Sequence, residues 1–285
     1  MIQIFMPDGS PTSFKIAEIT TRVVQLVLIP RNKLNELGNR KEVTNVGVYF
    51  LFGKGETDKK PNVYVGEAEN CFERLKQHNR DPKKDFWNVA ILAVSKTGSF
   101  TKSHVKFLES FCYKEILSVD RYTLINVNIP TQSRLSESMV ADLMDNFETM
   151  KTLLSALGYP IFERLANETA EELFYCKGKD AAARGEYTDE GFVVYKGSTC
   201  NLEEAASAGT WVINSRKELI ENNTLAIEGN ILRFKENHIF NSPSAAAACV
   251  LARRANGWTE WKSKEGITLD ELKRQDNGAT EVLEE

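Results

Sequence analysis

The sequence predicts a mixed α+β fold with two successive domains, and three observations lead to this prediction. With 285 residues, the chain is long enough for two domains of ordinary size. Strand-like and helix-like segments alternate over residues 45–130, and a second group of such segments begins near residue 170. We therefore expect an N-terminal extension over 1–44 that packs on a first domain of residues 45–160, followed by a small α+β domain over 170–285.

The first domain is expected to have a small central antiparallel sheet flanked by helices. β-Branched and aromatic residues fill 47–53 and 62–68, which predicts two strands joined as a hairpin by a long polar connection. The apolar segment 86–94 predicts a third, central strand. In the N-terminal extension, 23–29 has strand composition and 31–40 is expected to form a short helix.

Three longer helices are expected in the same domain. Asn70 is a good N-cap for the helix that follows it. A long helix starts at Thr101 or Ser103 and ends near Val119, because its apolar residues recur at helical spacing. The segment 136–157 predicts a third helix, capped by its first serine.

The C-terminal domain shows both strand and helix patterns. Gly229-Asn230 suits a tight hairpin between two strands. Ser242 can cap an Ala-rich helix over 245–254, with Pro243 at its first position. The pattern shows no catalytic cluster there. The expected strands are 173–177, 191–195, 224–228 and 231–235.

Composition is typical of a soluble protein, with 42% hydrophobic and 27% charged residues. The chain contains no run of about 20 apolar residues, as a membrane span needs, and its start does not look like a signal peptide. We therefore expect a cytoplasmic protein with no membrane partner. The five cysteines form no CxxC pair, so we expect small buried hydrophobes and neither a disulfide framework nor a zinc site.

The net charge of −4 is unusual for a nucleic-acid-binding protein, but the charge is uneven. Residues 41–130 hold 14 Lys/Arg against 11 Asp/Glu, whereas residues 131–190 hold 6 against 12. Residues 191–285 hold 11 against 14, which provides no electrostatic attraction to DNA. The mildly basic first domain is therefore compatible with a nucleic-acid substrate.

Two glycine–tyrosine triplets and four further residues follow one another in an order that resembles the GIY-YIG nuclease family. Fourteen residues separate the two tyrosines, more than the family name implies, and the surplus lies in a polar loop where insertions cost little. The resemblance covers about 85 residues. The matching positions are Gly47-Val48-Tyr49, Tyr64-Val65-Gly66, Arg74, His78, Glu109 and Asn126.

This resemblance implies a metal-dependent endonuclease, a hydrolase that cuts phosphodiester bonds of DNA with Mg²⁺ or Mn²⁺. The residue types fit that chemistry. Glu109 offers a carboxylate to a hard divalent cation, and Arg74 offers a bidentate grip on a phosphate. His78 lies one helical turn after Arg74 and titrates near neutral pH, so it can move a proton.

The resemblance also implies roles for the remaining residues. Tyr49 would take the proton of the attacking water, and Tyr64 would contact the phosphate or order the water. The sequence leaves both Tyr49 and His78 open as the general base. Asn126 would orient the active-site groups, with Asn128 as a competitor on the same face of an extended segment.

The C-terminal domain resembles a small domain of unknown function that is fused to GIY-YIG modules. It is also similar to domains associated with restriction enzymes and adenine methylases. The resemblance rests mainly on Trp258 and Trp261 in the segment 256–262. These tryptophans are either core residues or part of a specificity or partner module.

Two other functions stay open from the sequence. The site chemistry does not distinguish DNA from RNA, so an RNA- or structure-directed nuclease is one alternative. A non-catalytic module that binds nucleic acid or protein and retains the fold is the other. A protein partner or a homo-oligomer is compatible with either. Restriction, defence and repair are the biological settings that the resemblance implies.

Overall fold

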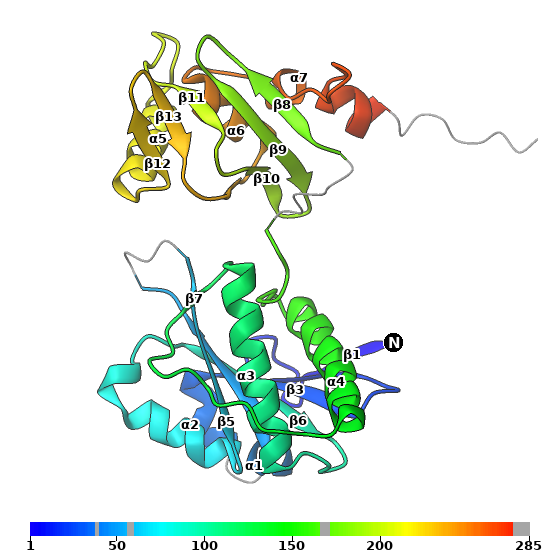
Figure 1. Cartoon of the computed structure of the whole chain (residues 1–285). Helices are drawn as coiled ribbons and strands as arrows, with labels where there is room; N and C mark the ends of the chain where they lie inside the picture. The colour runs from blue at the N-terminus through cyan, green and yellow to red at the C-terminus, as the bar shows by residue number, and fades with distance from the viewer. Residues whose placement is uncertain (38–39, 56–59, 166–171, 276–285) are drawn as a thin grey trace, which may run out of the picture. The chain divides into compact units, whose positions relative to one another are not determined.

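The computed structural model describes residues 1–37, 40–55, 60–165 and 172–275. They form two compact units, divided after Arg164 (Figure 1). Each unit has its own sheet and its own hydrophobic core. The predicted mixed α+β fold is confirmed. Residues 166–169 of the segment between the two expected domains lie outside the described residues.

Unit 1 contains a seven-stranded sheet in the order β1-β2-β3-β6-β4-β5-β7. All neighbouring strands are antiparallel except β5 and β7, which are parallel, so the sheet is larger than expected and not wholly antiparallel. The strands are β1 (Ile2–Phe5), β2 (Lys15–Ile19), β3 (Val24–Pro30), β4 (Gly47–Gly53), β5 (Asn62–Ala68), β6 (Val89–Ser95) and β7 (Thr123–Leu124).

The N-terminal residues are part of this sheet, whereas the sequence suggested an extension packed against it. β3 pairs with β6 along its whole length, and six of its seven residues are buried. An apolar run can be buried on both faces only inside a sheet that is covered on both sides. The composition of 23–29 therefore predicted the strand, but not its partner.

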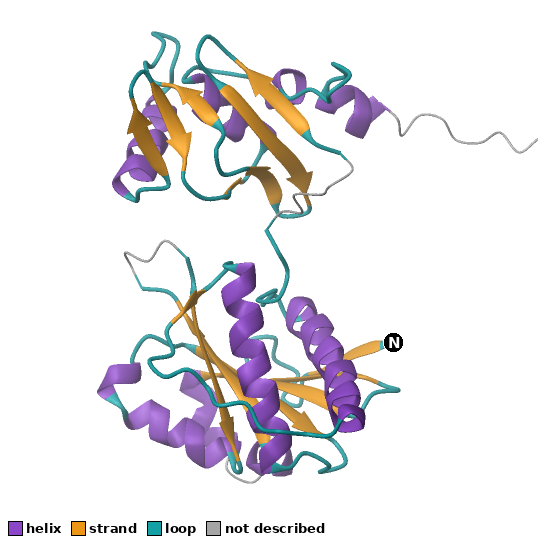
Figure 2. Ribbon diagram, in the orientation of Figure 1, coloured by secondary structure: helices purple, strands orange, loops and turns teal. Residues whose placement is uncertain are grey.

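Helices cover both faces of the unit 1 sheet (Figures 1 and 2). Alternate residues of β4 point to opposite faces: Val48 and Phe50 pack with α3 and α4, whereas Tyr49 and Leu51 pack with η1, α1 and α2. The helices are η1 (Arg31–Leu37), α1 (Lys41–Thr44), α2 (Cys71–Arg80), η2 (Pro82–Lys84), α3 (Lys102–Val119) and α4 (Glu137–Ala156).

The predicted helix starts are confirmed by their caps. The side chain of Asn70 accepts a hydrogen bond from the backbone N–H of Glu73 at 3.1 Å. Thr101, rather than Ser103, caps α3, and Ser136 caps α4. The helix expected over 31–40 is a 3₁₀ segment that ends at Leu37. Its expected end near Gly38 lies outside the described residues.

Unit 2 contains a second seven-stranded sheet, in which β12-β13-β11-β9-β10-β14 are consecutive and β8 pairs with β9. Its strands are β8 (Phe174–Lys177), β9 (Ala182–Thr188), β10 (Gly191–Val194), β11 (Thr199–Asn201), β12 (Leu225–Glu228), β13 (Ile231–Phe234) and β14 (His238–Phe240). Its helices are α5 (Thr210–Glu221), α6 (Pro243–Leu251), α7 (Gly257–Glu260) and η3 (Glu271–Gln275).

The predicted hairpin and capped helix of unit 2 are confirmed. Gly229 has a φ of 62° between β12 and β13, a conformation that favours glycine. Ser242 accepts a hydrogen bond from the backbone N–H of Ala245 at 3.1 Å, and Pro243 is the first residue of α6. The sequence missed β9, β11, β14 and α5, because β9 has few β-branched residues and α5 begins with several.

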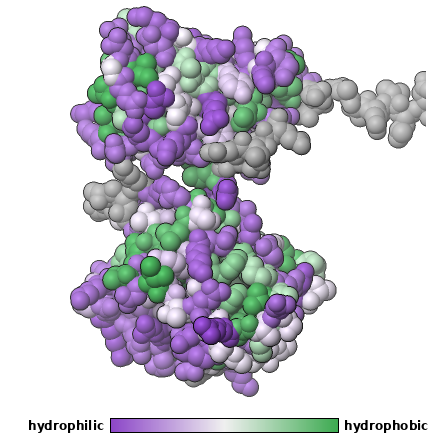
Figure 3. Space-filling view, in the orientation of Figure 1, coloured by the Kyte–Doolittle hydropathy of each residue, from purple (hydrophilic) through white to green (hydrophobic). Residues whose placement is uncertain are grey.

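None of the described helices is both long and apolar enough to cross a membrane. Over α3 and α4, the surface of unit 1 mixes polar and apolar patches (Figure 3). Between the start of α3 and the end of α4, the most exposed large hydrophobic residues are Leu117, Val127 and Ile129. Because they are interspersed with polar residues, this surface does not by itself identify a ligand.

Candidate active site

The pairing of β4 with β5 brings the two motif tyrosines together. Tyr49 lies directly opposite Gly66 in the sheet. A Cβ at Gly66 would lie 2.3 Å from both Cζ and the hydroxyl oxygen of Tyr49, so only glycine lets this ring lie across β5. Tyr64 is on the same face, and its ring centroid is 6.1 Å from that of Tyr49. The glycine of the second triplet thus has a defined steric role.

The glycine of the first triplet serves packing. A Cβ at Gly47 would lie 2.6 Å from the carbonyl oxygen of Ala93 on β6 and 3.0 Å from Sγ of Cys71. Cys71 is the first residue of α2. Gly47 therefore allows β6 and the start of α2 to approach β4 closely, which fixes the helix that carries Arg74 and His78.

Helix α2 places Arg74 and His78 against the tyrosines. The Tyr49 hydroxyl lies 2.8 Å from Nε2 of His78. Nε of Arg74 donates to the same hydroxyl at 3.3 Å. Because arginine can only donate, the hydroxyl oxygen accepts from Arg74. The phenol donates to His78 in the tautomer that carries its proton on Nδ1, and it accepts from His78 in the tautomer that carries its proton on Nε2.

Burial sets the protonation states of this group. Burial, and then the neighbouring Tyr64, hold the pKa of Tyr49 well above its usual value, although Arg74 opposes the shift. Burial, then the charges of Arg74 and Lys84, lower the pKa of His78 to about 4. At neutral pH the group is therefore a neutral phenol and a neutral imidazole beside a guanidinium.

Glu109 lies beside a second carboxylate, that of Glu67. Glu67 follows Gly66 on β5, and strand alternation turns it to the α3 face. Burial, and then the charge of Glu67, raise the pKa of Glu109 to about 7. Lys102 Nζ lies 2.9 Å from Glu67 Oε2, yet this buried oxygen receives no hydrogen bond in the described part of the chain.

Asn126 binds the backbone of β5 rather than the other site residues. Its Oδ1 accepts from the N–H of Val65 at 3.0 Å, and its Nδ2 donates to the Val65 carbonyl at 2.7 Å. This amide thereby extends the pairing of β5 beyond the short strand β7. The competitor Asn128 is exposed. Asn126 therefore holds in place the segment of β5 between Tyr64 and Gly66.

The structure thus brings four of the six predicted residues into one contact group. Tyr49, Tyr64, Arg74 and His78 interact directly. Glu109 and Asn126 interact with β5 from the side that faces α3 and β7. Across the described ranges, no hydrogen bond, ion pair or ring contact joins these two to the four.

Lys84 is a further cation of this group that the sequence did not reveal. Its Nζ lies 3.5 Å from the ring centroid of Tyr64. Lys84 ends η2, six residues after His78, and its neighbour Lys83 is exposed. The sequence offers no way to tell which of these two lysines turns toward the tyrosines. Glu67, in contrast, could have been identified from strand alternation.

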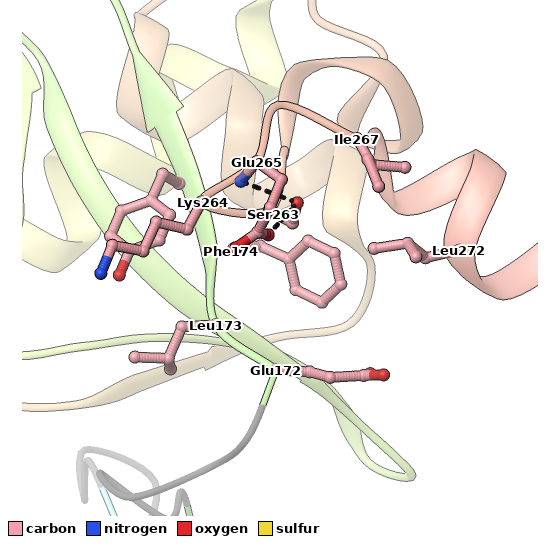
Figure 4. Close-up of a pocket in the computed structure, with 9 residues that line it drawn as sticks. Glu172, Leu173, Phe174, Ser263, Lys264, Glu265, Ile267 and Leu272 are labelled. Atoms are coloured by element: carbon pink, nitrogen blue, oxygen red, sulfur yellow. Dashed lines mark hydrogen bonds between the residues drawn. The ribbon is translucent and has the colours of Figure 1, made fainter.

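Unit 2 contains no comparable group among its described residues. A groove of about 360 Å³ lies between the start of β8 and the loop before η3 (Figure 4). Ser263 donates to Glu265 beside it, and Phe174, Ile267 and Leu272 provide much of its lining. Within the described ranges of the whole chain, no three His, Cys, Asp or Glu side chains form a cluster that could hold a metal ion.

The other polar and sulfur groups have structural surroundings. Nδ1 of His104 accepts from the N–H of Thr101 and completes the cap of α3. The five cysteines are free and buried, as expected. Trp261 is fully buried and donates to the Pro243 carbonyl, which confirms it as a core residue.

Comparison with known proteins identifies unit 2 only. The family described as Domain of unknown function (DUF4357) matches residues 174–273. The predicted C-terminal domain of unknown function is thereby confirmed. No curated protein and no solved structure matches the chain. The match includes none of the residues of the candidate site, which is interpreted from its own geometry.

Proposed function

We propose that unit 1 is a metal-dependent phosphodiesterase of the GIY-YIG type that cuts DNA. The observation that supports it most strongly is the hydrogen-bonded chain from Arg74 through Tyr49 to His78. These residues come from two separate sequence motifs, and a third motif residue, Tyr64, packs against them. Unrelated strand tyrosines and helix surface residues would have no reason to share one hydrogen-bond network.

A proton relay through Tyr49 to His78 fits these hydrogen bonds better than either residue acting alone as the general base. The attacking water passes a proton to Tyr49 while Tyr49 passes its own to Nε2 of His78. The raised pKa of Tyr49 opposes a stable phenolate, and the lowered pKa of His78 leaves Nε2 free to accept at neutral pH. The relay yields a hydroxide-like nucleophile and an imidazolium. It combines the two candidates that the sequence left open.

A bound phosphate would assist the relay electrostatically. The positive charges of Arg74 and Lys84 lower the pKa of His78. A phosphodiester carries one negative charge, and binding it beside these cations offsets their effect. The imidazole therefore becomes a stronger base when the substrate is present. Arg74 is exposed and can turn its remaining N–H groups toward the phosphate.

The carboxylates of Glu109 and Glu67 fit a hard divalent cation. Burial, and then the charge of Glu67, raise the pKa of Glu109 to about 7, and the buried Glu67 oxygen, which is ion-paired with Lys102, receives no hydrogen bond from the described residues. Mg²⁺ often takes only one or two protein carboxylates and keeps several waters. When bound to Glu109 and Glu67, Mg²⁺ or Mn²⁺ would neutralise charge that develops on the phosphate.

Several parts of this proposal rest on the resemblance alone. They are DNA as the substrate, a cytoplasmic location, and a setting in restriction, defence or repair. We assign unit 2 the role of a specificity or partner module. RNA cleavage remains an outcome that the experiment must distinguish, since the four contacting residues do not sense the sugar.

Cleavage of supercoiled plasmid, with Mg²⁺, Mn²⁺ or EDTA, tests this function. We expect metal-dependent nicking or linearisation by the wild type. Loss of either group in Glu109→Ala or Arg74→Ala should slow it by about 10²–10³-fold, as for loss of one transition-state donor. Matched RNA and single-stranded DNA are assayed in parallel. Metal-dependent cleavage of RNA alone would show that the substrate is RNA rather than DNA. If the wild type cleaved neither plasmid, single-stranded DNA nor RNA, the proposal of an enzyme would be contradicted.

A further inference from the structure

We propose that Lys84 and Arg74 form a two-cation phosphate clamp over Tyr64, in which Lys84 binds a nucleic-acid phosphate next to the one that is cut. This inference rests on the proposed function for its ligand. Its geometry comes from two elements, since Arg74 lies on α2 and Lys84 ends η2. Nζ of Lys84 lies 3.5 Å from the Tyr64 ring centroid, and Arg74 contacts the neighbouring Tyr49.

The two cations have no carboxylate partner within the described residues. Arg74 donates to the Tyr49 hydroxyl and to the side-chain oxygen of Gln77, and it also interacts with Tyr64. The acid that acts on Lys84, Asp81, accepts from the backbone N–H of Lys83 at 3.0 Å, and among the described residues it forms no ion pair with Lys84. The next lysine along α2, Lys76, does have such a partner. The clamp therefore retains most of its positive charge.

Holding the half-buried Lys84 beside the exposed Arg74 is unfavourable in the absence of an anion, because the two like charges repel. Burial, and then Arg74, lower the pKa of Lys84, while Asp81 opposes the shift. His78 is also affected by both cations. A phosphodiester would relieve this repulsion, because its oxygens accept charge-assisted hydrogen bonds from both side chains. Arrangements of this kind are common where proteins bind anions.

The Tyr64 ring restricts where Lys84 can reach. An ammonium over an aromatic face is attracted to the negative face of the ring. The four-carbon stem of Lys84 is thereby ordered before the ligand arrives, which reduces the entropy lost on binding. Lys83, one residue earlier, has the same charge but is exposed and has no ring contact. It provides a matched control.

Binding of a labelled 20-base-pair DNA duplex in EDTA, at several salt concentrations, tests the clamp with the full chain. Each phosphate contact contributes about −0.9 to the slope of log K against log salt. We expect Lys84→Gln to make the slope shallower by about that amount and to weaken binding, with no change in thermal unfolding. Lys83→Gln should leave the slope unchanged, and Lys84→Arg should restore it.

The same titration with single-stranded RNA identifies the source of the phosphate. A slope change with both ligands supports a backbone contact that does not distinguish the sugar, and a change with one ligand alone supports the clamp for that ligand. Equal slopes for Lys84→Gln and Lys83→Gln, or no binding by the wild type, would overturn the clamp. EDTA prevents metal-dependent cleavage, so this experiment measures binding alone. The clamp can therefore be supported or rejected whether or not the protein cuts nucleic acid.

Discussion

The two units use arginine in opposite ways. In unit 2, Arg216 on α5 is only 1% exposed. Its Nε donates to the Glu204 carboxylate at 3.1 Å, and its two terminal nitrogens donate to the carbonyls of Cys249, Asn201 and Leu202. Every guanidinium nitrogen is thereby satisfied by the fold. Arg216 ties α5 to β11 and α6.

In unit 1, Arg74 on α2 is exposed and only partly satisfied. It donates through Nε to Tyr49 and through one terminal nitrogen to Gln77. The guanidinium also interacts with Tyr64, and none of its contacts is to a carboxylate in the described part of the chain. The hydroxyl it contacts belongs to a buried tyrosine, and burial has shifted the pKa values around it.

The contrast separates polar groups that hold a fold together from groups that can serve a ligand. A buried polar side chain is costly unless the protein satisfies it completely, so a saturated group such as Arg216 is structural. Arg74 is exposed, and the pKa values of its neighbours Tyr49 and His78 are shifted. A group in such surroundings can still bind a ligand.

Removing Arg216 should destabilise unit 2 strongly. Arg216→Met leaves one buried and two part-buried backbone carbonyls without their donor, and each buried polar group left unsatisfied costs about 1–3 kcal/mol. Denaturant unfolding measures the change. Lys217→Met is the control, since Lys217 is exposed on the same helix. Similar unfolding free energies for the two variants would show that the hydrogen bonds of Arg216 do not stabilise unit 2.

His78 should make stability depend on pH between about 6.5 and about 4. Its folded pKa is lowered to about 4, so the unfolded chain binds the proton first as the pH falls. The stabilising contribution is complete above pH 6.5 and is lost as the pH falls to about 4. At about 1.4 kcal/mol per pKa unit, the loss approaches roughly 3 kcal/mol.

His78→Gln removes this titration. Unfolding free energies of both proteins at pH 7.5 and pH 4.5 give the difference that belongs to His78. We expect the wild type to lose more stability than His78→Gln. Parallel losses in the two proteins would mean that the fold does not lower the pKa of His78.

Gly66→Ala should disturb the tyrosine group by steric overlap. The new Cβ would lie 2.3 Å from the Tyr49 hydroxyl oxygen, and overpacking of this kind costs about 1–3 kcal/mol. Ala68 lies on the same face of β5, so the strand itself tolerates a Cβ. We expect the penalty to shrink in a Tyr49→Leu background, as a double-mutant cycle measures. An additive double mutant would contradict the proposed overlap.

Asn126→Ala should have the smallest of these effects. It removes two hydrogen bonds to the backbone of Val65, worth about 1–2 kcal/mol of unfolding free energy together. Asn128 is exposed, so Asn128→Ala should change little. This pair of variants decides between the two asparagines that the sequence left open. Equal effects would reject the role of Asn126 on β5.

The sequence predicted the individual elements of unit 1 better than their partners. Local patterns predicted β4, β5, β6 and the caps of α2, α3 and α4, because strand alternation and capping depend on near neighbours in the chain. Pairing of β3 with β6 depends on residues about 65 positions apart. No local pattern encodes it, so the N-terminal strands were expected outside the sheet.

The candidate site shows the same limit. Spacing alone placed Arg74 and His78 on one helix face, and the structure brings them to Tyr49 and Tyr64. Glu67 directly follows the second triplet, and strand alternation, which turns it toward α3, is a local signal that identifies it. Lys84 could not be chosen over Lys83 without the conformation of η2. Side chains on turns are therefore the part of the site that the sequence defines least.

The central claim is that the Arg74–Tyr49–His78 chain performs chemistry rather than supports the fold. The most direct test compares single-turnover cleavage of plasmid DNA by Tyr49→Phe and the wild type with Mg²⁺, beside their unfolding free energies. Our account predicts a rate lower by about 10²–10³-fold, with stability changed by no more than about 3 kcal/mol, the upper value for the two hydrogen bonds of the hydroxyl. An unchanged rate, or a loss that only follows unfolding, would contradict it.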